Sequence, residues 1–173
     1  MALLCESGDG VQGAESYVST AFIDTYWLNR THIALAATWA AGTTGHKEGA
    51  AREATAYADA MFGPYYRGQD RGYAQGLLFP RSNAFDDAGY PLPGLPPELQ
   101  AAVAELAARA LSATLAADLD RGGMIKSEQV DTIRVEYFEG AMAQKTYGLI
   151  MQALSPILNG SQPGAPNAHW SWA

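Results

Sequence analysis

The sequence has few of the residues that build disulfides, metal sites or a basic surface. Cys5 is the single cysteine among 173 residues, so no internal disulfide can form and we expect a reducing compartment. Lys and Arg number 11 against 18 Asp and Glu, which gives a formal net charge of −7. A protein that holds nucleic acid by its phosphates needs a basic surface, so this balance argues against such a role.

Long apolar runs and targeting signals are also missing. No apolar window approaches the length of a membrane span, so we expect no membrane partner. The first residues, MALLCESGDG, lack the basic segment and the long apolar run of a secretory signal. We therefore expect a soluble intracellular product.

Signatures of catalysis and of cofactor binding are weak. His32, His46 and His169 are far apart and have no partners at ligand spacing, so surface or core positions are favoured over a metal site. GDGVQG at 8–13 has the glycine spacing of a dinucleotide-binding loop, but it lacks the preceding strand and the βαβ pattern, which favours a simple turn. We predict that the protein is not an enzyme and binds no cofactor or metal.

The alanine-rich parts of the chain favour helices. Ser19 can cap a helix that begins at Thr20, and the longest helix opens at Pro96-Pro97 and ends at Gly122-Gly123. The last helix is apolar on every side, so it is expected to be buried, either in the core of its own chain or against another subunit. The periodicity predicts helices over 20–28, 32–40, 46–62, 96–121 and 141–158.

Residues 63–97 hold most of the prolines and form one long connection. A loop of this length is often functional, but it can also wrap over the helices, pinned by Phe79 and Phe85. Its start, FGPYYRGQDRGY, mixes tyrosines with Arg67 and Arg71, the composition of a platform that stacks single-stranded bases. The alternative is a packed loop whose arginines pair with Asp59 or Asp70.

Alternating apolar and polar residues predict one β-hairpin, with strands at Met124–Val130 and Ile133–Phe138 and a turn at Asp131-Thr132. Ile133, Val135 and Tyr137 are expected on one face. Since an isolated two-stranded hairpin is marginally stable in water, we expect a neighbouring subunit or partner strand to cover it. Packing on the helices of the same chain is the alternative.

The polar tail, residues 159–173, ends in Trp170 and Trp172. A large aromatic side chain on a Pro- and Gly-rich arm is typical of a segment that anchors in a partner's pocket. The alternatives are a disordered tail and a tail that folds back over its own core.

Taken in order, the segments GDGVQGAESYVS, FPRSNAFDDAGYPL and LDRGGMIKSEQV resemble a group of tailed-phage proteins. Members of this group are labelled putative DnaT-like single-stranded-DNA-binding proteins, and they are similar to helical head-tail connector (adaptor, or head completion) proteins. The resemblance covers residues 1–158. It implies a mainly α fold, with a small helical bundle and a protruding hairpin at about 124–138, followed by a C-terminal arm at 159–173.

The resemblance also implies a function. About twelve copies would form a ring that joins the portal to the next neck or tail protein. Double-stranded DNA would pass through the ring without specific binding, in a virion assembled in the bacterial host cytoplasm. From composition and position we expect portal contacts at His169, Trp170 and Trp172, and contacts between subunits or rings at Lys126, Glu128, Arg134 and Glu136. The alternative is a single-stranded-DNA-binding protein that uses Arg67, Arg71 and the nearby tyrosines.

Overall fold

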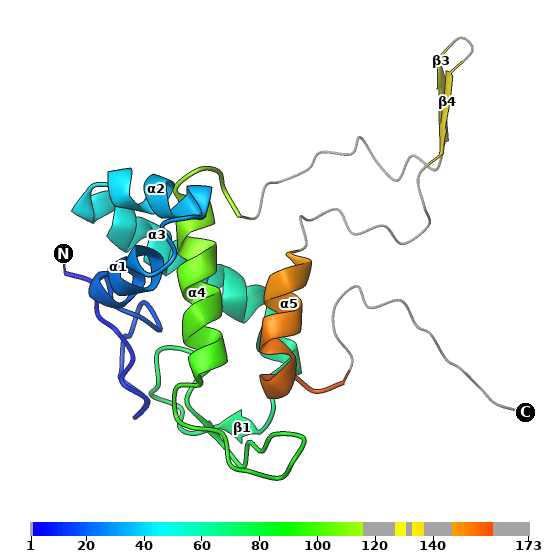
Figure 1. Cartoon of the computed structure of the whole chain (residues 1–173). Coiled ribbons are helices and arrows are strands. Elements are labelled where there is room, and N and C mark those ends of the chain that lie inside the picture. The colour runs from blue at the N-terminus through cyan, green and yellow to red at the C-terminus, as the bar shows by residue number, and fades with distance from the viewer. Residues whose placement is uncertain (1, 116–126, 131–132, 137–146, 161–173) are drawn as a thin grey trace, which may run out of the picture. The chain divides into compact units, whose positions relative to one another are not determined.

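The computed structural model describes residues 2–115, 127–130, 133–136 and 147–160 (Figure 1). The chain divides into two compact units, one made of residues 1–115 and 147–173, the other of residues 116–146. Within the described residues the first unit holds five α-helices and the second holds a two-stranded antiparallel hairpin. The predicted fold class, mainly α with a small hairpin, is confirmed.

The first two helices begin close to where the sequence places them. Helix α1 spans Thr20–Leu28, and the Ser19 side chain accepts a backbone hydrogen bond from its first turn, as predicted. Helix α2 spans Ala34–Ala41. Helix α3 spans Thr44–Phe62 and begins two residues earlier than predicted, because Thr43 acts as its N-terminal cap.

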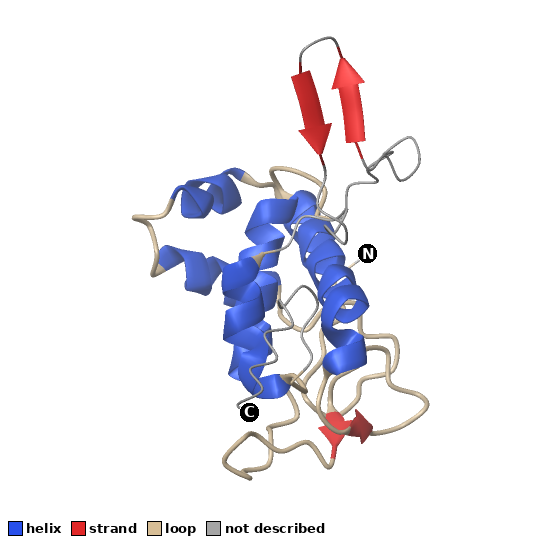
Figure 2. Ribbon diagram, turned by 90° about the vertical axis from the view of Figure 1, so that its right-hand side faces the viewer, coloured by secondary structure: helices blue, strands red, loops and turns tan. Residues whose placement is uncertain are grey.

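Helices α3 and α4 (Pro97–Ala110) form the centre of the first unit (Figures 1 and 2). The buried side chains of α3 are mostly alanines, and this allows the α4 backbone to approach closely. Trp27 of α1 fills the space beside α4, and its indole N–H donates a 3.1 Å hydrogen bond to the Ala104 carbonyl. The core therefore combines small residues between α3 and α4 with large aromatic and aliphatic side chains, among them the buried Trp27, Trp39 and Leu106.

The end of helix α4 differs from the prediction. Helix α4 ends at Ala110 rather than near Gly122-Gly123, and residues 116–126 lie outside the described residues. The buried Leu115 donates its backbone N–H to Glu53 Oε1 at 2.9 Å, so a carboxylate of α3 binds the chain where the sequence pattern extends the helix. This contact between distant residues competes with continuation of the helix.

The last helix begins and ends inside the predicted range, and the predicted residues 141–146 lie outside the described residues. Helix α5 spans Gly148–Leu154, and Ser155–Ile157 form the 3₁₀ turn η2, since Pro156 cannot continue an α-helix. Leu149 is 79% exposed, so the described part of this helix is not buried on every side within its own chain, and burial against another subunit stays a prediction. Every helix in the described ranges is too short or too polar to cross a membrane.

The long connection after α3 is packed onto the helical unit. It starts with the 3₁₀ turn η1 (Gly63–Tyr65) and contains a short ladder between β1 (Gln69–Asp70) and β2 (Arg81–Ser82). Phe79 is fully buried, as expected, with its ring edge-on to Tyr17 and Tyr66. Phe85 is 48% exposed, so the prediction that it pins the loop is wrong.

The hairpin of the second unit consists of β3 (Ser127–Val130) and β4 (Ile133–Glu136). Val130 pairs with Ile133 and Ser127 with Glu136, the register expected for a turn at residues 131–132. The strands are described over four residues each, and the remaining predicted strand residues, 124–126 and 137–138, lie outside the described residues.

Candidate functional site

The segment that the sequence suggests for stacking bases, Tyr65–Tyr73, is largely used to hold the fold together. Tyr66 is buried, and its hydroxyl donates to the Ala58 carbonyl at 3.3 Å and lies 3.5 Å from Asp59 Oδ1. Tyr65 is partly buried against the core. These two rings are therefore not free to stack on bases.

Arg67 also has a structural role. Its guanidinium donates 2.9 and 3.1 Å hydrogen bonds to the carbonyls of Leu158 and Phe85 and forms an ion pair with Asp87. The predicted alternative, pairing with an acidic residue, is confirmed in kind, but the partner is Asp87 rather than Asp59 or Asp70. Arg67 thereby joins three segments that are distant in sequence.

Arg71 and Tyr73 remain exposed in the same region. Arg71 donates a 3.2 Å hydrogen bond to the Gly8 carbonyl, and the Tyr73 side chain is fully exposed. Both side chains are exposed and lie in the segment that borders a hollow in the surface. Of the residues proposed for stacking, these two are the ones that solvent and ligands can reach.

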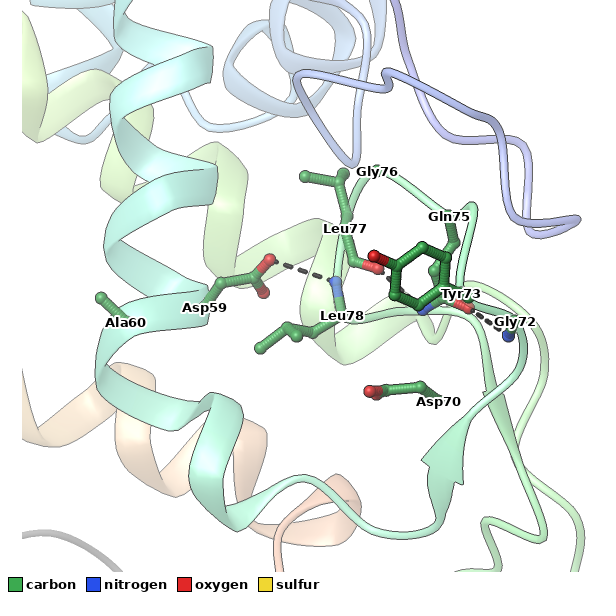
Figure 3. A pocket seen from close by; sticks show the side chains of 9 residues that line it. All are labelled: Asp59, Ala60, Asp70, Gly72, Tyr73, Gln75, Gly76, Leu77 and Leu78. Carbon is green, nitrogen blue, oxygen red and sulfur yellow. Dashed lines mark hydrogen bonds between the residues drawn. The ribbon is translucent and has the colours of Figure 1, made fainter.

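A hollow of about 710 Å³ lies between the end of α3 and the loop after β1 (Figure 3). The side chains of three polar lining residues, Asp59, Asp70 and Gln75, are already engaged with the protein. Asp59 Oδ2 accepts a 3.3 Å hydrogen bond from the Leu78 N–H, and Asp70 pairs with Arg81 at 2.9 Å. The Gln75 side chain accepts from two backbone N–H groups and donates to two carbonyls. The lining thus stabilises the loop.

Asp59 is the centre of a buried hydrogen-bond network. Its Oδ1 accepts a 2.6 Å hydrogen bond from the Tyr17 hydroxyl, which in turn accepts from the Phe79 N–H at 3.1 Å. Burial raises the pKa of Asp59, although its hydrogen bonds to Tyr17 and Leu78 act in the opposite direction. Burial and the nearby Asp59 charge also raise the pKa values of Tyr17 and Tyr66, so both remain hydroxyl donors at neutral pH.

The glycine motif GDGVQG surrounds an anion, and that anion belongs to the chain itself. The buried Glu6 carboxylate accepts hydrogen bonds of 2.8–3.1 Å from the successive backbone N–H groups of residues 7–11. Gly8 and Gly10 have φ values of +97° and +89°, which the curved backbone requires. The predicted simple turn is therefore a backbone nest that binds Glu6.

The remaining candidate residues do not form a site with those above. Lys126, His169, Trp170 and Trp172 lie outside the described residues, and Glu128, Arg134 and Glu136 are backbone positions in β3 and β4. His32 lies in the turn after α1 and His46 in the first turn of α3. In the described part of the chain no group of three His, Cys, Asp or Glu residues could hold a metal ion.

The pKa of the Cys5 thiol is raised, mainly because the thiol is partly buried.

Three residues that organise this region were not predicted from the sequence: Glu6, Asp59 as an acceptor for Tyr17, and Arg81. Arg81 binds the carbonyls of Arg67 and Gly68 as well as Asp70. The partners of Arg81 and Asp59 that are named here are 11 to 42 positions away, beyond any local pattern. Only Glu6 had a sequence signal, since the glycines that follow it are suited to a nest.

The chain was compared with protein families, with curated proteins and with solved structures. Neither the curated proteins nor the solved structures gave a match. Residues 1–169 match the model of a family described as "Putative DnaT-like ssDNA binding protein". This match covers nearly the whole sequence, and the chain therefore belongs to that family.

Proposed function

We propose that this family member is a structural, non-catalytic virion protein that forms a ring at the head-tail junction. The ring would join the portal to the next neck or tail protein and extend the channel for double-stranded DNA. The observation that carries the proposal is the state of the basic side chains. Every lysine and arginine whose side chain the structure describes binds a carboxylate or a backbone carbonyl: Arg30, Lys47, Arg52, Arg67, Arg71, Arg81 and Arg109.

This charge arrangement suits a channel through which DNA slides. Acidic side chains outnumber basic ones in each of the two units. Ion pairs at a surface contribute little to stability, but each partner carboxylate cancels the positive potential that would attract a phosphate. DNA can then pass with little adhesion.

The hairpin unit supports assembly with other chains. Each strand of the β3–β4 ladder has one edge unpaired by any other described strand, and such an edge can accept a further strand. We assign the contacts with neighbouring subunits or the next ring to Lys126, Glu128, Arg134 and Glu136.

The ends of the hairpin unit are fixed to one helix of the first unit. Leu115, just before it, is bound by Glu53, and Tyr147, just after it, packs edge-on to Tyr57 with 6.0 Å between ring centroids. Glu53 and Tyr57 are four residues apart and so lie one turn apart on α3. The hairpin unit is therefore an insertion with adjacent attachment points.

The proposal is tested by mixing the protein with the portal protein of the same phage, followed by light scattering and electron microscopy. We expect a ring on the portal. Ending the chain after Gly160, which retains the Asn159 bond to the Tyr65 carbonyl, should weaken portal binding and leave the helical unit folded. The variant Trp170→Ala/Trp172→Ala should do the same, while Ser171→Ala is the matched control. Undiminished portal binding by the truncated chain would reject the assignment of His169, Trp170 and Trp172.

The family description favours a second candidate function, binding of single-stranded DNA. Arg71 and Tyr73 are the exposed residues that could serve it. A titration with labelled oligonucleotides at low and high salt separates the two functions, because phosphate contacts weaken steeply with salt. Tight, salt-sensitive binding that is lost in Arg71→Ala/Tyr73→Ala, but kept in the control Arg30→Ala, would establish this function and overturn the channel proposal.

A further inference from the structure

Residues 84–92 form a rigid loop that we call the aromatic loop. Asp86 organises it: its Oδ1 accepts hydrogen bonds of 2.9 and 2.8 Å from the Ala88 and Tyr90 N–H groups, and its own N–H donates to the Tyr90 carbonyl at 2.9 Å. Gly89, with φ +84°, completes the turn, and the Leu92 N–H donates to the Ala84 carbonyl. The loop conformation is thus fixed by its own hydrogen bonds.

This rigid loop exposes two aromatic side chains. Phe85 is 48% exposed and Tyr90 is 70% exposed. Because the backbone is already ordered, covering these rings costs little further conformational entropy, and aromatic side chains dominate the energy of many contact surfaces. The aromatic loop is therefore well suited to receive another apolar segment.

The C-terminal arm, residues 159–173, begins beside this loop. Asn159 donates its N–H to the Tyr65 carbonyl at 2.7 Å, and the Arg67 N–H donates to the Ile157 carbonyl at 3.0 Å. The guanidinium of Arg67 then binds both the Leu158 carbonyl and the Phe85 carbonyl. One side chain therefore links the start of the arm to the base of the aromatic loop.

The composition of the arm suits a contact at short range. Its first part, NGSQPGAPNA, is a polar Gly/Pro-containing linker, and the arm has no Lys, Arg, Asp or Glu. The carboxylates of the aromatic loop therefore do not repel it. The ten residues from Gly160 to Trp170 have a root-mean-square span of roughly 16–19 Å. This is long enough to reach the aromatic loop, because the guanidinium of Arg67 contacts both the Leu158 carbonyl and the Phe85 carbonyl.

We propose that the C-terminal arm folds back on its own chain and packs Trp170 and Trp172 against Phe85 and Tyr90 of the aromatic loop. The tether keeps the indoles at a high effective concentration near the loop, so the contact forms without a second molecule. It covers the aromatic loop in the free protein. Portal binding, if the proposed function is correct, uses the same indoles and excludes this contact.

Tryptophan fluorescence of the full chain tests the contact. Trp27 and Trp39 are buried in the helical unit, so subtracting the spectrum of Trp170→Phe/Trp172→Phe from that of the wild type isolates the indoles of the arm. We expect this difference spectrum to be blue-shifted from that of free tryptophan in water and to resist quenching by acrylamide. The double variant Phe85→Ser/Tyr90→Ser should shift it to the free-tryptophan position.

Controls make each outcome decisive. Leu28→Ser on α1 removes another exposed apolar side chain, 73% exposed, and should leave the difference spectrum unchanged. Circular dichroism checks that all variants keep their helix content. A wild-type difference spectrum equal to that of free tryptophan, or one insensitive to Phe85→Ser/Tyr90→Ser, overturns the proposal. A blue shift that disappears on dilution also overturns it, because it assigns the contact to a second copy. None of these readings depends on portal binding.

Discussion

The Tyr17 hydroxyl donates a 2.6 Å hydrogen bond to Oδ1 of Asp59, a residue 42 positions later in the chain. The same hydroxyl accepts the Phe79 N–H, and the other oxygen of Asp59 accepts the Leu78 N–H. One buried pair thus fastens the N-terminal segment and the long connection to helix α3. The architecture around the hollow in Figure 3 depends on this pair.

Tyr17→Phe should destabilise the protein by about 1–3 kcal/mol, because it removes a donor to a buried carboxylate and leaves the Phe79 N–H without its acceptor. The measurement is urea unfolding at neutral pH. Tyr90→Phe is the matched control, since that ring is 70% exposed and its loss of a hydroxyl should change the stability little. Equal effects of the two substitutions would contradict the role given to the Tyr17 hydroxyl.

Asp59→Asn should change how stability depends on pH. Burial raises the pKa of Asp59 above its ordinary value of 3.8, so the folded state binds a proton more readily than the unfolded state. Protonation of Asp59 therefore adds to the free energy of unfolding. This stabilisation is fully present below the ordinary carboxyl pKa and is lost as pH rises through the raised pKa of the folded state.

The free energy of unfolding of the wild type, relative to that of Asp59→Asn, should therefore increase as the pH is lowered from neutral. Unfolding by urea across a series of buffers measures the difference. Asp70→Asn serves as a control, because Asp70 is 62% exposed at its side chain. A difference between wild type and Asp59→Asn that shrinks on acidification would refute the predicted sign.

Glu6→Ala should loosen the N-terminal loop, because it leaves the N–H groups of residues 7–11 without their shared acceptor. We expect the free energy of unfolding to fall by about 2 kcal/mol or more. Each buried donor without a partner costs about 1–3 kcal/mol, and water can replace only some of the lost hydrogen bonds. Hydrogen exchange should become faster at these amides. Asp9→Ala, which removes an exposed carboxylate from the same loop, should leave their exchange unchanged; faster exchange in both variants would show that the nest does not depend on Glu6.

Gly94→Ala should disrupt packing between the N-terminal loop and the segment before α4. A Cβ atom on Gly94 would lie 2.2 Å from the Gly8 carbonyl oxygen, so the two backbones would have to separate. Gly49→Ala is the opposite case, because Gly49 lies within α3 and nothing is within 4 Å of its added Cβ. We expect this substitution to raise the free energy of unfolding by roughly 0.5–1 kcal/mol. Thermal unfolding of both variants checks the contrast, and a stable Gly94→Ala protein would refute the close approach.

The sequence alone predicted the elements that depend on neighbouring residues. Ser19 indicated the start of α1, the periodicity over 46–62 indicated most of α3, and Pro97 indicated the start of α4. The position of the hairpin and its turn at residues 131–132 also followed from alternation over a few positions. These signals arise within one or two turns, where residue type and backbone geometry are coupled directly.

The candidate site could be predicted only in part, because its contacts join residues that are distant in the sequence. The composition FGPYYRGQDRGY suggested a stacking surface, but Tyr66 and Arg67 are held by Asp59, Leu158 and Asp87. The predicted ion pair was correct in kind, while its partner was not. Which acid an arginine meets depends on how the long connection packs, and composition does not contain that information.

The sequence by itself determined that this chain is mainly helical, acidic and equipped with one hairpin, since these properties follow from periodicity and charge. Tertiary structure decided where α4 ends, which carboxylate the glycine motif binds and which aromatic rings remain exposed. The physical reason is that buried carboxylates and backbone N–H groups must find partners when they leave water. For Asp59 and for Glu53 those partners come from parts of the chain that only folding brings together.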